Sequence, residues 1–105
     1  MPSNRGELNL SAYEEIITEA RKLAEEKYKG YGPDNIGAFA DFGCLVRAND
    51  KIQRMKTIYL RRFNSGVSED KALVGAVPDE KIDDDIKDAI NYLVYMLMCR
   101  RGQWM

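Results

Sequence analysis

The fold of this chain is decided by the stretch Asp83-Asp84-Asp85-Ile86-Lys87-Asp88-Ala89-Ile90-Asn91-Tyr92. Apolar residues recur here and beyond at the spacing of a helix, which turns by about 100° per residue, so the stretch predicts a helix. Asp85 falls inside the apolar arc, and Asp88 lies at its edge one turn later. A carboxylate within a buried stripe is costly unless it meets a cation, a metal ion or hydrogen-bond donors. The helix therefore either holds a structural ion pair or lines a binding site.

Two further helices are predicted before this one. The first covers residues 11–29, because Ser11 and Glu14 make a capping box ahead of an apolar stripe. The second covers about residues 35–63, after a turn rich in glycine. The residues of the first helix that we expect to face the core are Tyr13, Ile16, Ile17, Ala20, Leu23, Ala24 and Tyr28. In the second helix they are Leu45, Ala48, Ile52, Met55, Tyr59 and Phe63.

The third helix is expected to run to Arg100, with Asp79 as its N-cap and Gly102 as its stop signal. No alternating run of strand length is present, so the predicted fold is all-α, a small antiparallel bundle of three helices. The third helix is apolar over about half its circumference or more, which is broader than the usual stripe of a surface helix. This breadth predicts burial on two sides, in a dimer or larger homo-oligomer.

With 105 residues, the chain is expected to form one domain, residues 1–105, of which 1–10 are flexible. Sixteen basic and seventeen acidic residues leave a formal charge of −1, which argues against general nucleic-acid binding. No apolar run reaches the length of a membrane span, and the polar N-terminus does not resemble a signal peptide. We therefore expect a cytoplasmic protein that does not bind membranes.

Histidine is absent, which removes the commonest general base and zinc ligand. Cys44 and Cys99 lack the spacing of a metal site and read as small core residues in a reduced compartment. No arrangement of a nucleophile with a base is recognisable. Any catalysis is therefore expected to use a metal-bound water.

Asp85 and Asp88 are the best candidate ligands for a hard cation such as Mg²⁺, since they can share one helix face. Lys27 is their counterpart, a base on the apolar stripe of the first helix. A buried ion pair between Lys27 and Asp85 is the structural alternative to a site for phosphate and Mg²⁺. The sequence leaves both interpretations open.

On the second helix, Arg47, Lys51, Arg54 and Arg61 recur at helical spacing and could receive the phosphates of a nucleotide. Asp50 lies among them at the spacing of ordinary surface ion pairs, so a solvated charged face is the alternative.

These residues together resemble a known pattern. It joins Lys27-x-x-x-Tyr31-Gly32, Arg47-x-x-Asp50-Lys51-x-x-Arg54 and Asp84-Asp85-x-x-Asp88-x-x-Asn91-Tyr92. The order and spacing resemble the small phage and bacterial family called nucleotide modification associated domain 1. The resemblance spans about residues 11–97 and implies a role in nucleotide metabolism or modification. It implies that Lys27, Tyr31, Arg47, Lys51, Arg54 and Asn91 contact the nucleotide.

A more distant resemblance is to the all-α nucleoside triphosphate pyrophosphatases of the MazG type, which bind Mg²⁺ with an ExxE and an ExxD motif. Asp85-Ile86-Lys87-Asp88 is similar to the second motif, with Asp in place of Glu. The first motif is absent, although Glu19 on the first helix could serve as a third ligand. This likeness implies that Asp85 and Asp88 are catalytic and hold Mg²⁺.

Two functions are therefore expected. The first is a MazG-like protein that binds a nucleotide with Mg²⁺ and hydrolyses a nucleoside triphosphate to monophosphate and pyrophosphate. The second is a non-catalytic phage accessory protein that binds a protein partner through its wide apolar face.

Overall fold

The described residues of the computed structural model are 6–31, 40–64 and 80–103. Within them all regular structure is helical, so the all-α prediction is confirmed. The three helices are α1 (Leu10–Tyr31), α2 (Ala40–Asn64) and α4 (Glu80–Arg100). Part of the expected second helix, residues 35–39, lies outside the described residues, as do the expected N-cap Asp79 and residues 1–5 of the flexible segment.

The N-terminus of α1 is capped earlier than the sequence predicted. The backbone N–H of Ala12 donates a hydrogen bond of 3.0 Å to Asn9 Oδ1, and the N–H of Tyr13 donates one of 3.0 Å to the Asn9 carbonyl. Asn is as good an N-cap as Ser, so Asn9 begins the helix two residues before Ser11. The predicted capping box of Ser11 and Glu14 is therefore wrong.

The helix α4 ends at Arg100, and Gly102 is its stop signal, as predicted. Its φ of +65° places this glycine in the left-handed region. The N–H of Gly102 donates to the Cys99 carbonyl at 3.1 Å, and the N–H of Gln103 donates to the Met98 carbonyl at 2.8 Å. These two bonds are the Schellman arrangement, which satisfies carbonyls that the helix leaves open.

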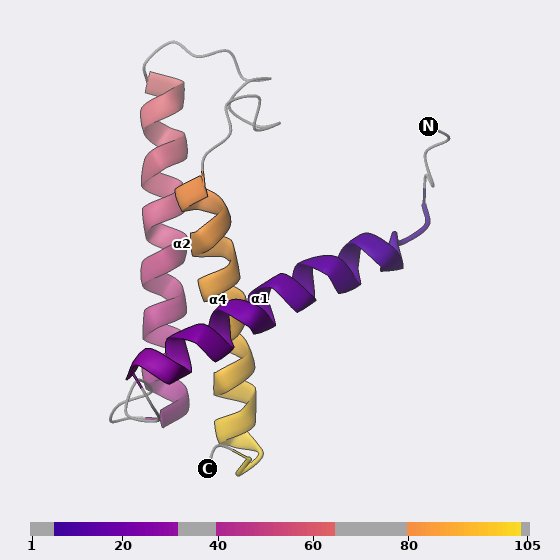
Figure 1. Ribbon diagram of the computed structural model, residues 1–105. Helices are drawn as coiled ribbons and strands as arrows, with labels where there is room; N and C mark the ends of the chain where they lie inside the picture. Colours follow the sequence, from indigo (N-terminus) through magenta and orange to yellow (C-terminus); the bar gives the residue numbers. More distant parts are fainter. Residues whose placement is uncertain (1–5, 32–39, 65–79, 104–105) are drawn as a thin grey trace.

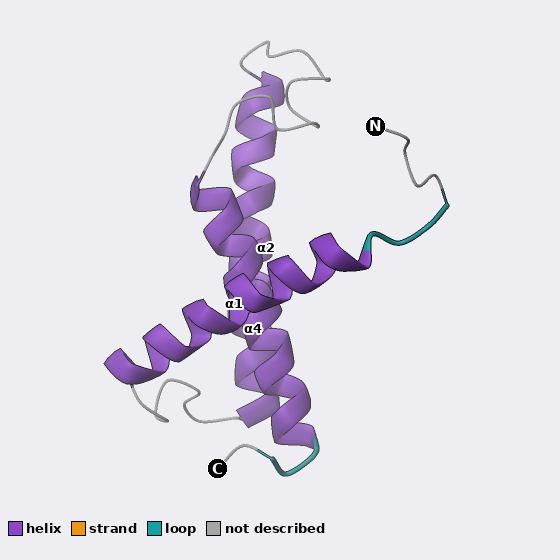
Figure 2. Cartoon of the chain, turned by 45° about the vertical axis from the view of Figure 1, so that its right-hand side comes forward, coloured by secondary structure: helices purple, strands orange, loops and turns teal. Residues whose placement is uncertain are grey.

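The helices α2 and α4 run antiparallel, side by side, and α1 crosses them steeply (Figures 1 and 2). In both views the first half of α1 extends beyond the α2–α4 pair. Among the described helices, backbone contacts join α1 to α4 and not to α2, and in Figure 2 both ends of α1 project beyond the pair. The result is an antiparallel pair with one helix laid across it.

The core between these helices is built from small residues. Among the residues whose burial is described, the buried apolar ones are Ala20, Cys44, Ala48, Ile82 and Ala89. Small side chains at a contact allow two helices to approach closely. Three polar residues, Asp85, Asp88 and Asn91, are buried with them. Much of the close-packed interior is therefore polar and charged.

Several residues expected in the core are exposed instead. On α1, Tyr13, Ile16 and Ile17 are each more than a third exposed, because no described helix lies beneath this half of α1. On α4, Leu93, Val94 and Leu97, which belong to its broad apolar face, are also close to half exposed. On α2 the same holds for Leu45, Ile52 and Phe63. None of the three described helices is both long and apolar enough to cross a membrane.

Candidate functional site

Five charged side chains that are distant in the sequence meet where α1 crosses the α2–α4 pair. We call them the ion cluster: Lys27, Lys51, Arg54, Asp85 and Asp88. Each of the three helices contributes at least one member. All five are predicted as site residues from the sequence. The tertiary structure therefore brings together the two predicted acidic residues and three of the predicted phosphate-binding residues.

Matched spacing on two antiparallel helices explains how α2 and α4 form their part of the cluster. Lys51 and Arg54 are three residues apart on α2, and Asp85 and Asp88 are three residues apart on α4. Three residues rise by about 4.5 Å in any α-helix, so the two pairs face each other as two rungs. In one rung Lys51 Nζ lies 3.2 Å from Asp88 Oδ2, and in the other Arg54 Nε lies 3.1 Å from Asp85 Oδ2. Lys51 Nζ also lies 4.0 Å from Asp85 Oδ1, so it bridges both carboxylates.

Lys27 of α1 completes the cluster from the third helix. Its Nζ donates a hydrogen bond of 2.6 Å to Asp88 Oδ1. The predicted alternative of an ion pair between Lys27 and Asp85 is therefore wrong in its partner, because α1 crosses α4 one turn further along than that pairing requires. Asp88 receives two lysines, one on each oxygen.

The cluster is layered, with its acids inside and its bases toward solvent. The side chains of Asp85 and Asp88 are 2% and 8% exposed, whereas that of Arg54 is 54% exposed. With three cations and two carboxylates, the ion cluster has a net charge of +1. Such an arrangement attracts an anion to the surface while keeping acidic oxygens beneath it.

One oxygen of this cluster has an ion-pair partner but no hydrogen-bond donor within the described part of the chain. Asp85 Oδ2 is buried and accepts no hydrogen bond from the described residues. Arg54 Nε lies 3.1 Å from this oxygen and forms an ion pair with it, but its N–H does not point at the oxygen and so donates no hydrogen bond. A buried carboxylate oxygen without a donor is costly, so this atom is the natural point for a further ligand.

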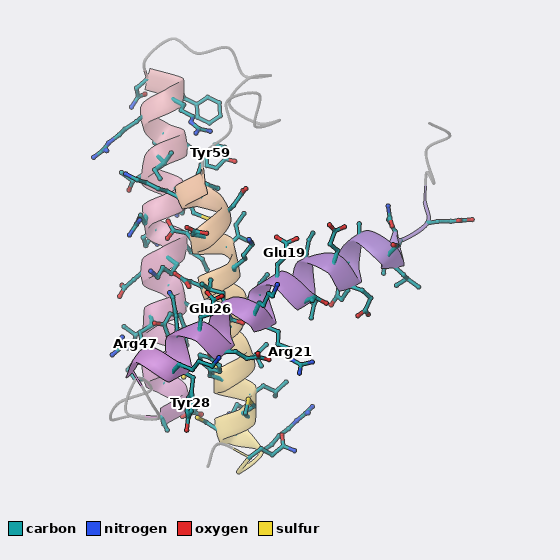
Figure 3. All side chains as sticks on the ribbon, viewed as in Figure 1. Glu19, Arg21, Glu26, Tyr28, Arg47 and Tyr59 are labelled. Atoms are coloured by element: carbon teal, nitrogen blue, oxygen red, sulfur yellow. The ribbon has the colours of Figure 1, made fainter. Side chains whose placement is uncertain are left out.

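Glu19 does not join the two aspartates as a third metal ligand. Its Oε1 pairs instead with Lys87 Nζ of α4 at 3.0 Å; Glu19 is labelled on α1 in Figure 3. The carboxylate raises the pKa of Lys87, chiefly through this hydrogen bond. Among the described residues, no three acidic or cysteine side chains are grouped closely enough to hold a metal ion. Any cation at this site would therefore have two protein carboxylates at most from the described residues.

The remaining predicted nucleotide contacts behave differently from one another. Asn91 is buried, and its Nδ2 donates a hydrogen bond of 2.8 Å to the Ala20 carbonyl, so it joins α4 to α1. Arg47 is exposed near the beginning of α2 and is outside the cluster contacts (Figure 3). Tyr31 ends α1, and its side chain lies outside what the structure describes.

One feature of the site was accessible in the sequence but was not recognised. The equal spacing of Lys51 to Arg54 and of Asp85 to Asp88 is the signal for a double rung between antiparallel helices. The pairing of Glu19 with Lys87 had no comparable signal, because it depends on the angle at which α1 crosses α4.

The pKa of the Cys44 thiol is raised to about 11. Burial is the main cause, and the neighbouring Cys99 thiol adds to it.

The hollows beside the helices are apolar. One, of about 500 Å³, is lined by residues of α1 and α4, and another, of about 570 Å³, by one face of α2. Neither includes a member of the ion cluster. The chain has no significant match among protein-family models, curated proteins or solved structures.

Proposed function

We propose that this chain binds the phosphate groups of a nucleotide, together with a divalent cation, at the ion cluster. Lys27, Lys51 and Arg54 would neutralise the phosphates, since all three cations are partly open to solvent and converge from two helices. Asp85 and Asp88 would hold the cation beneath them. The resemblance of the motifs to nucleotide modification associated domain 1 supports the same assignment.

The observation that carries this proposal is that Asp85 Oδ2 is buried and has an ion-pair contact but no hydrogen-bond donor among the described residues. A purely structural ion cluster is stabilising only when its buried oxygens are fully paired. Here a 2% exposed residue keeps one oxygen without a hydrogen bond beside an arginine whose N–H is not aligned with it. A cation or a bridging water would satisfy that oxygen.

The donor set fits Mg²⁺ rather than a transition metal. Mg²⁺ commonly uses one or two carboxylates, with water and substrate phosphates as its other ligands. The cluster supplies two carboxylates and neither cysteine nor histidine. Lys51 contacts both acids, so cation binding would require it to move toward the phosphate that arrives with the metal. The cation would then replace Lys51 as the partner of the carboxylates, and the phosphate would become the partner of Lys51. Metal and nucleotide should therefore bind together.

The test is a melting-temperature screen of the full chain with nucleoside triphosphates, monophosphates and modified deoxynucleotides, each with and without Mg²⁺. A ligand that binds only the folded state at 100 times its Kd stabilises by about 2.7 kcal/mol, which is readily measured. We expect a shift that requires both metal and nucleotide and that is lost in Asp85→Asn. Glu19→Gln is the matched control, because Glu19 lies outside the cluster, and it should retain the shift.

Other outcomes would overturn the proposal. One is the absence of a shift across the panel in a protein whose circular dichroism is helical. Another is a shift that survives unchanged in Asp85→Asn. If binding is observed, pyrophosphate release measured on the same triphosphates tests whether the site also hydrolyses them, as the MazG-like resemblance implies.

For a protein with this function we expect a cytoplasmic location, because nucleotides are abundant there.

A second function, a non-catalytic interaction protein, is favoured by a different observation. Both aspartates already have basic partners, and many large apolar side chains of all three helices remain exposed. Exposed apolar surface of this extent is typical of binding surfaces. A helical protein without any nucleotide-dependent shift would support this second function.

A further inference from the structure

The first half of α1 and the second half of α4 form an apolar corner that no described residue covers. We call it the α1–α4 groove, and its walls are Tyr13, Ile16 and Ile17 from α1 and Leu93, Val94 and Leu97 from α4. All six are between 38% and 52% exposed. Figure 2 shows the first half of α1 standing away from the pair of helices that it crosses.

We propose that a second copy of this chain fills the α1–α4 groove, so that the folded unit is a twofold-symmetric dimer. The proposal is independent of nucleotide binding, because the ion cluster lies outside the groove. It commits to a copy of the same chain for three reasons, which concern the core, the shape of the groove and its charges.

The first reason is the small core that the described residues form. Among them, Ile82 is the largest of the five buried apolar residues, and the others are three alanines and Cys44. Burial of large apolar side chains is the main favourable term in folding, and small cores leave little net stability. A partner needed by every folded copy is most simply another copy, since it is present whenever the chain is made.

The second reason is that the two walls of the groove are equal in length. The hydrogen bond from Asn91 to the Ala20 carbonyl marks where α1 and α4 meet. From that point α1 extends ten residues back to Leu10, and α4 extends nine residues on to Arg100. At a rise of 1.5 Å per residue, these arms are about 15 and 14 Å long. Two corners with equal arms can interlock about a twofold axis, each α1 arm lying against the partner's α4 arm.

The third reason is charge. Residues 6–20 contain four glutamates, of which Glu19 pairs with Lys87 of its own chain, and no basic residue, whereas residues 90–103 contain two arginines and no acidic residue. In the interlocked arrangement the acidic beginning of one α1 meets the basic end of the partner's α4. Arg100 Nη1 lies 3.7 Å from Asp41 Oδ2 in its own chain. The side chain of Arg100 is nevertheless 63% exposed, so it can also pair with a glutamate of the partner. The groove is therefore complementary to itself in apolar surface and in charge.

The test is the mass of the full chain in solution, measured without nucleotide by light scattering and sedimentation over a range of concentrations. We expect a dimer at micromolar concentration. Leu97→Asp should raise the dimer Kd by about 100-fold or more, because a twofold interface carries the substitution twice. Leu60→Asp is the matched control: Leu60 is 57% exposed on α2, outside the groove, and its substitution should leave the mass unchanged. Circular dichroism of each variant separates lost association from lost folding.

A charge exchange tests the orientation even if Leu97→Asp fails to fold. Glu15→Arg and Arg101→Glu should each weaken the dimer, and the double variant should restore it. A monomer at all concentrations would overturn the proposal, as would a dimer that Leu60→Asp disrupts and Leu97→Asp does not. Additive weakening by the two charge variants would overturn the arrangement. None of these results depends on Asp85 or on Mg²⁺, so this proposal and the nucleotide proposal fail separately.

Discussion

The buried amide of Asn91 donates a hydrogen bond of 2.8 Å to the backbone carbonyl of Ala20, at the point where α4 crosses α1. This contact lies where α1 rests on α4. Seven residues after Ala20, two turns further along α1, Lys27 reaches Asp88 and completes the ion cluster. Before Ala20, the same helix becomes one wall of the α1–α4 groove. The two features for which we propose a function thus lie on either side of this one contact.

Replacing Asn91 with alanine should loosen α1 more than the rest of the protein. The change removes a buried hydrogen bond and leaves the Ala20 carbonyl without its side-chain donor, so we expect a loss of about 1–3 kcal/mol in the free energy of unfolding. Hydrogen exchange should accelerate in α1 before α2 and α4. Urea unfolding and peptide-resolved exchange measure the two effects. Uniform acceleration in all three helices would contradict this role for Asn91.

Replacing Lys51 with methionine should cost more stability than the same change at Lys27. Lys51 lies within 4.0 Å of both carboxylates, whereas Lys27 contacts only Asp88. Removing one partner leaves a buried charge poorly compensated. We expect losses of about 2–3 kcal/mol for Lys51→Met and about 1–2 kcal/mol for Lys27→Met, reduced because these lysines are partly exposed. Equal losses in urea unfolding would show that the bridging contact has no energetic weight.

Stability should fall with rising pH between about 9 and 11 because of Cys44. Burial raises the pKa of its thiol from 9.0 to about 11, so between these values the unfolded chain releases a proton that the folded chain retains. The unfolded state is therefore favoured progressively as pH rises through this window, and below pH 9 the thiol contributes no pH dependence. Urea unfolding at pH 8, 9, 10 and 11 measures the trend. Cys44→Ala should show a shallower decline, and parallel curves for the two proteins would contradict the assignment.

Replacing Gly102 with alanine should destabilise the end of α4 through the backbone alone. The glycine has φ +65°, and an added Cβ would meet no atom within 4 Å. A left-handed conformation costs a non-glycine residue about 1–2 kcal/mol, so we expect a loss of about 1 kcal/mol. Gln103→Ala, at the exposed neighbouring residue, is the control and should have no measurable effect in thermal unfolding. A Gly102→Ala protein as stable as the parent would show that the last turn is already frayed.

The sequence was sufficient for the helices and for the members of the ion cluster, because both depend on local periodicity. Apolar spacing located α1, α2 and α4, and Gly102 was recognised as the stop of α4 from residue type alone. Asp85 and Lys27 were selected because each interrupts an apolar stripe, and such an interruption needs a partner wherever the helix packs. The N-cap was mislocated because Asn9 and Ser11 are equally suitable by type, and only the path of the chain distinguishes them.

The pairings and the exposed faces were decided by the tertiary structure. Whether Lys27 meets Asp85 or Asp88 depends on where α1 crosses α4, a property of packing that helical periodicity does not contain. The same crossing leaves Ile16 and Leu97 open to solvent, although their spacing is that of core residues. Periodicity specifies which side of a helix is apolar. Only the arrangement of helices in space determines which part of that side the chain covers itself and which part remains for a partner.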